Sequence, residues 1–166
     1  AACEARAARH YWRHFFDGLS FDEWRREPGT RAGVNGMLDY IYAVLRTAVL
    51  RSLAAHGFIA ALGLHHADRE GTFALADDLM EPLLPWADRH LLEHLAADNA
   101  PGDMRAWIPA AAGVLTLDVR VRNSRVRLLH AIDLLVQSFR RATLEQKNWP
   151  LLIPMLPEAR RGTGPA

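Results

Sequence analysis

The chain has 166 residues, which is enough for one domain with a sizeable buried core. Half of the residues are hydrophobic and 23% are charged, as in ordinary globular proteins, and no apolar stretch reaches the ~18–20 residues of a membrane-spanning helix. The net charge of +1 gives no general argument for binding nucleic acid. The single cysteine, Cys3, excludes an internal disulfide and a cysteine-ligated zinc cluster and suits a reducing cytosol.

The first predicted element is an amphipathic helix at about residues 2–16. Its apolar residues recur at helical spacing, and its arginines lie on another face. Glu4 lies one turn before Ala8 and therefore projects close to the apolar side. A charged segment rich in helix breakers follows and predicts a linker over residues 17–33.

The longest helical pattern covers about residues 35–56, with a wide apolar stripe and Gly57 as its stop signal. A third helix is predicted at about residues 73–84, with Pro82 near its end. The segment 85–97 is also predicted to be helical.

The only strand pattern lies in the second half of the chain. Residues 115–122 alternate between apolar and polar side chains, and a polar turn follows, which predicts a short β-hairpin within 115–127. A final long helix is predicted at about 128–146, and the proline-rich tail from Trp149 is predicted to be extended. The predicted fold class is therefore mostly α, a single helical domain over residues 1–166.

Histidine and acidic side chains are concentrated between residues 65 and 81. Asp78 and Glu81 are spaced i and i+3 on a predicted helix, so both carboxylates share one face. Such oxygen ligands suit magnesium and manganese, manganese also accepts an imidazole, and His66 could complete the set. The spacing alone leaves an alternative open, in which Asp77 and Asp78 favour a helix N-terminus and Glu81 is a solvated helix residue.

A second metal motif occurs in the helix predicted at 85–97. His90, Glu93 and His94 spell H-x-x-E-H, the inverted zincin signature, for which Glu145 and Glu158 are the only downstream glutamates that could supply a third ligand. A five-residue match arises easily by chance in a chain with eight histidines, so an ordinary amphipathic helix is the competing interpretation.

Arginine dominates the basic residues, since Lys147 is the single lysine among 20. Six arginines fall between residues 117 and 141: Arg120, Arg122, Arg125, Arg127, Arg140 and Arg141. A guanidinium pairs with phosphate through a planar two-pronged fork, so the bias favours phosphate contact. High-GC coding bias would produce the same enrichment.

Several blocks occur in a fixed order: "EARAARHYW" from Glu4, "VNGMLDYIYAVLRTAVLRSLAAHGF" from Val34, then "LGLHH" and "LADDLMEP". Together with "RVRLLHAIDLLVQSF" and "LLIPMLPE", they span roughly residues 1–160. This series resembles the C-terminal catalytic helical domain of the CRISPR-associated spacer-acquisition integrases, the first of the Cas proteins, and is most similar to their type II forms.

The resemblance implies a metal-dependent DNA integrase or endonuclease of CRISPR adaptation. Carried over position by position, the family's metal ligands fall on Glu4, His66 and Glu81, with Asp78 as an additional acid beside the metal. The implied cofactor is Mg²⁺ or Mn²⁺. The implied reaction joins the 3′-hydroxyl ends of a prespacer DNA to the CRISPR leader–repeat by transesterification. The arginines expected to contact DNA phosphates are Arg6, Arg9, Arg13 and Arg69.

The resemblance also implies partners and marks two departures. We expect DNA, a second copy of the chain and the second, small Cas adaptation protein as partners, in the cytoplasm of a prokaryote, with no membrane. Asp39 stands where the family usually has asparagine, and the family's N-terminal β-rich domain is not expected in this chain. The competing functions are a DNA-binding assembly module without catalytic competence and, from the H-x-x-E-H motif, a zinc peptidase.

Overall fold

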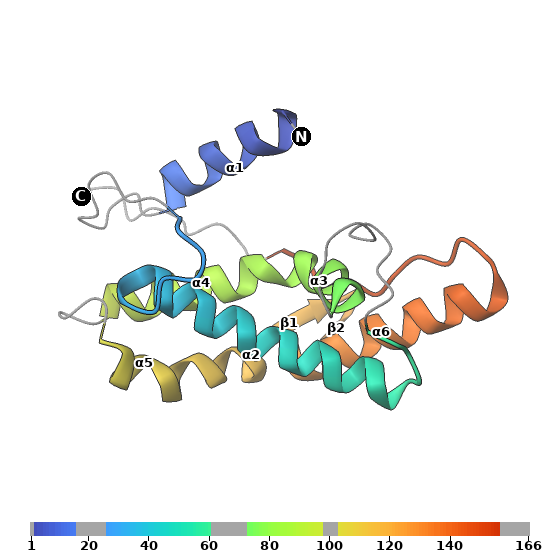
Figure 1. Ribbon diagram of the computed structural model, residues 1–166. Helices are drawn as coiled ribbons and strands as arrows, with labels where there is room; N and C mark the ends of the chain where they lie inside the picture. The colour runs from blue at the N-terminus through green and yellow to red at the C-terminus, as the bar shows by residue number, and fades with distance from the viewer. Residues whose placement is uncertain (1, 16–25, 61–72, 98–102, 157–166) are drawn as a thin grey trace, which may run out of the picture.

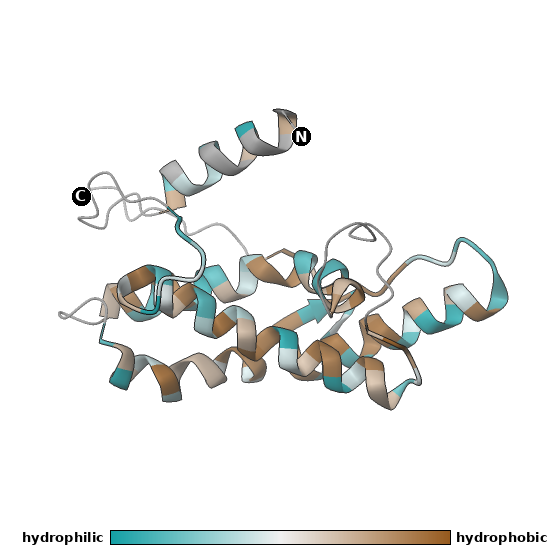
Figure 2. Ribbon diagram, viewed as in Figure 1, coloured by the Kyte–Doolittle hydropathy of each residue, from teal (hydrophilic) through white to brown (hydrophobic). Residues whose placement is uncertain are grey.

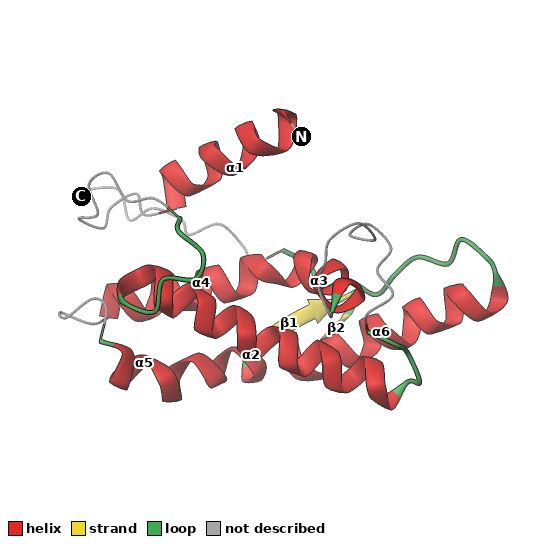
Figure 3. Cartoon of the chain, in the orientation of Figure 1, coloured by secondary structure: helices red, strands yellow, loops and turns green. Residues whose placement is uncertain are grey.

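The computed structural model describes residues 2–15, 26–60, 73–97 and 103–156, and these are mostly helical (Figure 1). The α-helices are α1 (Ala2–Phe15), α2 (Gly33–Ala55), α3 (Ala74–Met80), α4 (Leu84–Ala97), α5 (Met104–Ala111) and α6 (Leu128–Glu145). Two 3₁₀ helices, η1 (Glu81–Leu83) and η2 (Ala112–Thr116), and two strands, β1 (Asp118–Val121) and β2 (Ser124–Arg127), complete the described elements. The predicted mostly α fold class with a short hairpin is confirmed, as Figure 3 shows.

Helix α2 is the centre of the fold. It packs against α3, α4, α5 and α6, so its apolar stripe is covered on several sides (Figure 1). Met37, Leu38, Ile41, Leu45 and Leu53 each have no exposed surface. Burial of a side chain of this kind contributes about 1.5–3 kcal/mol, so the stripe predicted at 35–56 supplies a large share of the core. Figure 2 shows the apolar residues gathered where the helices face one another.

The helix predicted at 73–84 is interrupted. Helix α3 ends at Met80, and the single turn η1 joins it to α4. Pro82 explains the break, because proline has no backbone N–H to continue the α-helical hydrogen bonds. The junction leaves Glu81 exposed at the end of α3 while Leu83 is fully buried.

The predicted strand at 115–122 begins later than expected. Residues up to Thr116 form η2, which continues directly from α5, and the strand starts at Asp118. Over so few residues, alternation of apolar and polar side chains does not distinguish a strand from a 3₁₀ turn. The turn is stabilised by the fully buried Val114 and by a hydrogen bond of 2.8 Å from Thr116 Oγ1 to the Gly113 carbonyl. Strands β1 and β2 pair antiparallel and pack on α6.

Helix α5 was not predicted. Asp103 is its N-cap and accepts a hydrogen bond from the Arg105 backbone N–H at 2.9 Å. Trp107 is fully buried and donates from Nε1 to the Met37 carbonyl at 2.9 Å, which ties α5 to α2. The helix therefore depends on tertiary contacts more than on a periodic sequence pattern.

The chain after α6 runs without regular structure to Leu156, as predicted for the tail. It returns to the sheet, where the Met155 backbone N–H donates to the Arg120 carbonyl at 2.8 Å. The Leu152 N–H donates to Ser138 Oγ at 2.9 Å, so the tail is fastened at two points. Within the described part of the chain, no helix is long and apolar enough to cross a membrane.

Candidate metal and DNA site

The acidic residues at the end of α3 are Asp77, which pairs with an arginine of α2, and Asp78 and Glu81, which belong to the predicted metal site. Asp77 forms an ion pair with Arg46 of α2, with 2.7 Å between Nε and Oδ1, and so fastens α3 to the central helix. Asp78 is half-buried, and Glu81 is exposed at the junction with η1. The i, i+3 spacing places Asp78 and Glu81 on one side of the helix, next to the break at Pro82.

The structure describes only part of the predicted metal set. Glu4 lies within α1, but its side chain is outside the described residues, as are His65, His66 and the whole segment 61–72. Among the residues that the structure does describe, no three metal-binding side chains come together. The assignment of Glu4, His66 and Glu81 as ligands, with Asp78 beside them, therefore stays a prediction.

The predicted DNA contacts are described in part as well. Arg6 is exposed on α1, and its Nη2 lies 4.0 Å from Cys3 Sγ, one turn away. The side chains of Arg9 and Arg13 are not among the described ones, and Arg69 lies in the undescribed segment. An exposed guanidinium on the helix that carries Glu4 agrees with a phosphate contact and equally with a solvated helix face.

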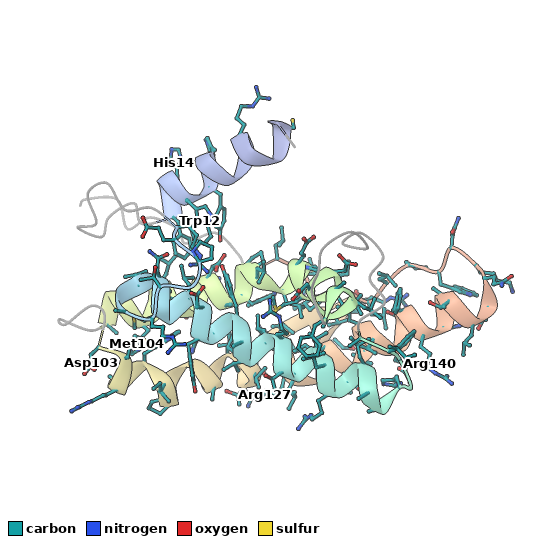
Figure 4. All side chains as sticks on the ribbon, in the orientation of Figure 1. Trp12, His14, Asp103, Met104, Arg127 and Arg140 are labelled. Carbon is teal, nitrogen blue, oxygen red and sulfur yellow. The ribbon has the colours of Figure 1, made fainter. Side chains whose placement is uncertain are left out.

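Helix α1 is attached to the rest of the fold by the aromatic residues near its C-terminal end. Phe15 is buried and Trp12 packs against the core, and Figure 4 shows Trp12 between α1 and the helices below it. Tyr11 donates a hydrogen bond to Asp88 Oδ2 of α4 at 2.5 Å. Tyr42 of α2 donates to the other oxygen, Oδ1, also at 2.5 Å. One carboxylate thus joins three helices.

Asp88 is only 4% exposed, and its environment changes its acidity. Burial raises the pKa of Asp88 to about 6, although the hydrogen bonds from Tyr11 and Tyr42 and the nearby Arg26 oppose the shift. The pKa of both tyrosine hydroxyls is raised far above its usual value, first by burial and then by the Asp88 charge. Both tyrosines therefore stay protonated and donate to Asp88 throughout the ordinary pH range.

The beginning of α2 holds the segment before it. Asn35 Oδ1 accepts hydrogen bonds from Arg26 Nη1 (3.1 Å) and the Glu27 backbone N–H (2.9 Å). Asp39, one turn further on, forms an ion pair with Arg26 and accepts from the Gly29 N–H at 2.6 Å. The N-x-x-L-D-Y block therefore has a structural task, in which Asp39 supplies a charge for Arg26 that asparagine would lack.

The family model described as CRISPR associated protein Cas1 matches residues 1–104, which is more than half of the chain. The chain belongs to the Cas1 family.

Relatives and one solved structure extend this match. A CRISPR-associated endonuclease Cas1 of Neisseria meningitidis serogroup C is 36% identical over 156 residues, covering 91% of this chain and 48% of that protein. A CRISPR-associated endonuclease Cas1 of Pyrobaculum aerophilum is 32% identical over 118 residues, covering 68% of this chain and 38% of the relative. A casposase bound to integration product has the same fold, with a TM-score of 0.73 at 22% identity, covering 94% of this chain and 52% of that one. The chain spans about half the length, or less, of these proteins.

Within this Cas1 domain the H-x-x-E-H motif has contacts of its own. His90 Nε2 lies 2.8 Å from the Ala110 carbonyl oxygen, and the Glu93 carboxylate pairs with Arg89 at 2.8 Å. The ring of His94 packs 4.8 Å from that of Trp107, centroid to centroid. The two histidine contacts join α4 to α5, and the Glu93–Arg89 pair lies within α4. The motif therefore acts as a helix-packing element, and the zinc interpretation loses its support.

Sequence reasoning missed Asp88. A signal was present, because Leu84, Asp88, Leu91 and Leu95 follow one another at helical spacing along α4, and Leu91 and Leu95 are buried. An acid within an apolar stripe is expected to have a buried partner. The partner tyrosines are 77 and 46 residues away, and no local pattern indicates them.

Proposed function

We propose that this Cas1-family chain carries the catalytic helical part of a metal-dependent DNA integrase or endonuclease of CRISPR adaptation. The observation that carries the proposal is the acidic pair Asp78 and Glu81 at the α3–α4 junction of a domain that matches the Cas1 family model. Relatives at 32–36% identity are named endonucleases, and the structural neighbour is a casposase bound to integration product.

The residues present fit a hard divalent cation. Glu81 offers an exposed carboxylate at a helix junction, Asp78 lies one turn before it, and Asp77 is already held by Arg46. Oxygen ligands of this type suit Mg²⁺ or Mn²⁺, and the resemblance adds Glu4 and an imidazole from His66. When bound, the ion would supply Lewis-acid activation of a phosphate and stabilisation of the developing negative charge.

The chemistry proposed is a transesterification at phosphorus. The 3′-oxygen of a prespacer end forms a bond to a phosphorus atom of the leader–repeat, the existing bond from that phosphorus to a 3′-oxygen breaks, and the proton lost by the attacking hydroxyl is taken up by the leaving oxygen through solvent. No bond between the enzyme and DNA is needed. The task of Asp78 and Glu81 is to place oxygen ligands beside the scissile phosphate, while Asp77 keeps their helix on α2.

The proposed partners follow from the same assignment. They are prespacer DNA and the leader–repeat, a second copy of the chain, and the second, small Cas adaptation protein, with the prokaryotic cytoplasm as the place of action. The arginines proposed for backbone contacts near the metal are Arg6, Arg9, Arg13 and Arg69.

A strand-transfer assay tests the proposal. The purified protein is incubated with a fluorescent prespacer, a supercoiled plasmid carrying a leader–repeat, and Mn²⁺, beside Glu81→Gln and the matched variant Glu145→Gln. We expect plasmid-joined label from the wild type and from Glu145→Gln, whose exposed acid pairs with Arg141 within α6, and none from Glu81→Gln.

The competing functions predict other results. If the wild type binds DNA but joins no label, the domain acts as an assembly module and the catalytic proposal is wrong for this chain. If Glu81→Gln joins as much label as the wild type, the acidic pair is not the site. A zinc-dependent peptidase activity that is lost in Glu93→Gln would support the H-x-x-E-H motif instead.

A further inference from the structure

The hairpin β1–β2 presents two arginines side by side. The antiparallel register pairs Arg120 with Arg125, and the neighbouring pair on the same face is Asp118 with Arg127. The alternate positions turn the other way, and Val119 and Val121 are buried. Arg120 and Arg125 are both exposed, so the outer face of the hairpin carries their guanidinium groups.

The charges on this face are only partly compensated. Asp118 forms an ion pair with Arg127, with 3.4 Å between Oδ1 and Nη1. Among the described side chains, no acid pairs with Arg120 or Arg125. Like charges directly opposite one another destabilise a strand pair. An anionic ligand would remove this repulsion.

These two arginines line a cleft of about 340 Å³ between the hairpin, the start of α4 and the chain after α6. Its apolar walls include Trp86, Met155 and Leu156. Two acids also line it, and each has an arginine partner: Glu93 pairs with Arg89, and Asp118 pairs with Arg127. We call this the arginine cleft. It thus combines two arginines that pair with no described acid, two acids already paired with other arginines, and an aromatic and aliphatic wall.

The arginine cleft is connected to the candidate metal site through the start of α4. Trp86 is in the first turn of α4, which follows directly from η1 and Glu81. Figure 1 shows the chain after α6 returning toward the hairpin, where the Met155 N–H bonds to the Arg120 carbonyl. The helix that begins just after Glu81 therefore supplies one wall of the arginine cleft.

We propose that the arginine cleft binds backbone phosphates of the DNA on which the α3–α4 junction acts, an inference that rests on the proposed function. Arginine matches phosphate through two parallel N–H bonds, and the two guanidiniums supply the charge for two phosphates. The apolar wall suits the faces of bases or sugars next to those phosphates. An acidic peptide could pair with the same two arginines. Its carboxylates would gain little from the Trp86 indole, and Asp78 and Glu81 at the helix junction just before Trp86 would repel them.

The test measures how DNA binding depends on salt. Binding of a fluorescent single-stranded or duplex oligonucleotide is followed by anisotropy over a salt series for the wild type and for Arg120→Gln/Arg125→Gln. Two lost phosphate contacts lower the slope of log Kobs against log[salt] by about 1.4 for a single strand or about 1.8 for duplex. The matched control is Arg105→Gln/Arg140→Gln, which removes two exposed arginines elsewhere and is expected to leave the slope unchanged.

Further variants keep the result interpretable. Arg120→Lys/Arg125→Lys retains both charges and is expected to restore the slope. If the double glutamine variant does not fold, as judged by circular dichroism, Arg125→Gln alone is expected to lower the slope by about half as much. Equal slopes for wild type and cleft variants, or equal losses in the cleft and control variants, would overturn the assignment. The assignment would also be overturned if the cleft variant bound the oligonucleotide as the wild type does but lost binding to a polyglutamate peptide. That result would indicate an acidic protein partner.

Failure of this inference and failure of the proposed function give different results. Glu81→Gln is expected to keep the wild-type salt slope while it loses joining. If the wild type joins DNA but the cleft variant keeps its slope, only the arginine cleft is wrong. If the slope falls in the cleft variant and the wild type joins nothing, the cleft binds DNA and the catalytic proposal is wrong.

Discussion

Tyr11 Oη donates a 2.5 Å hydrogen bond to Asp88 Oδ2 and so connects α1 to α4 across 77 residues of sequence. Glu4, the proposed metal ligand, lies seven positions before Tyr11, which is two helical turns and the same face of α1. Glu4 therefore occupies a helix position on the side of α1 that docks on Asp88. The position of α1, and with it the backbone position of Glu4, depends on this buried carboxylate.

Removal of Asp88 is expected to be costly. Asp88→Ala leaves the hydroxyls of Tyr11 and Tyr42 without their acceptor. A buried hydroxyl without a partner costs about 1–3 kcal/mol, and the cost is smaller for Tyr11, which is 41% exposed, than for the half-buried Tyr42. We expect the free energy of unfolding to fall by roughly 3 kcal/mol in urea titrations. Tyr11→Phe removes one donor and is expected to cost about 1–1.5 kcal/mol. An Asp88→Ala variant as stable as the wild type would contradict the role of Asp88 as a connector of three helices.

The raised pKa of Asp88 predicts a pH dependence of stability. The folded pKa of about 6 lies above the usual value of 3.8, so between these values the folded state binds more protons than the unfolded state. The contribution of Asp88 is therefore greatest at low pH, decreases as the pH rises through this window, and is constant above it. The full change amounts to roughly 3 kcal/mol, from about 1.4 kcal/mol per unit of pKa.

Comparison with Asp88→Asn isolates this contribution from the other acids. Asparagine does not titrate, so the stability of the wild type relative to Asp88→Asn should fall between about pH 4 and about pH 6 and then stay level. Urea unfolding of both proteins over that range measures the difference. A relative stability that rises with pH would mean that the folded pKa of Asp88 is lowered rather than raised.

Asp39 offers a test of the ion pair at the start of α2. Asp39→Asn keeps a side-chain oxygen for the Gly29 N–H but removes the charge beside Arg26, whose side chain is only 13% exposed. We expect a loss of about 1–2 kcal/mol in unfolding free energy and faster tryptic cleavage after Arg26 and Arg31. The surface pair Asp118–Arg127 provides the control, since Asp118→Asn is expected to change stability by less than about 0.5 kcal/mol. Equal losses of unfolding free energy in Asp39→Asn and Asp118→Asn would show that partial burial does not strengthen the Arg26–Asp39 ion pair.

Whether an element could be predicted from the sequence depends on how far apart along the chain the residues that stabilise it lie. Helices α2 and α6 were predicted to within about two residues, because their periodic apolar stripes pack directly on the core. Helix α5 has only eight residues and an internal Pro109, so its pattern is weak, and it is held by Trp107 bonding to Met37. The acidic step at Asp78 and Glu81 was predicted from local spacing. Asp88 escaped prediction because its partners are on other helices.

Pro82 is expected to set the geometry of the acidic junction. In a continuous helix the N–H of residue 82 would bond to the Asp78 carbonyl. Proline has no N–H, so α3 ends at Met80 and the 3₁₀ turn η1 begins at Glu81. Pro82→Ala allows α3 to continue toward α4, which rotates Glu81 relative to Asp78. Alanine is the better helix former, so stability should change by less than about 1 kcal/mol.

The readout of this change is metal binding together with joining. We expect Pro82→Ala to weaken Mn²⁺ binding, measured by electron paramagnetic resonance of the free ion, and to lower the rate of prespacer joining about tenfold, which corresponds to roughly 1.4 kcal/mol. Pro109→Ala, a proline inside α5, is the matched control and should leave both measurements unchanged. Wild-type Mn²⁺ affinity in a stable Pro82→Ala protein would mean that the junction, and with it the placement of Glu81, does not depend on the break in the helix.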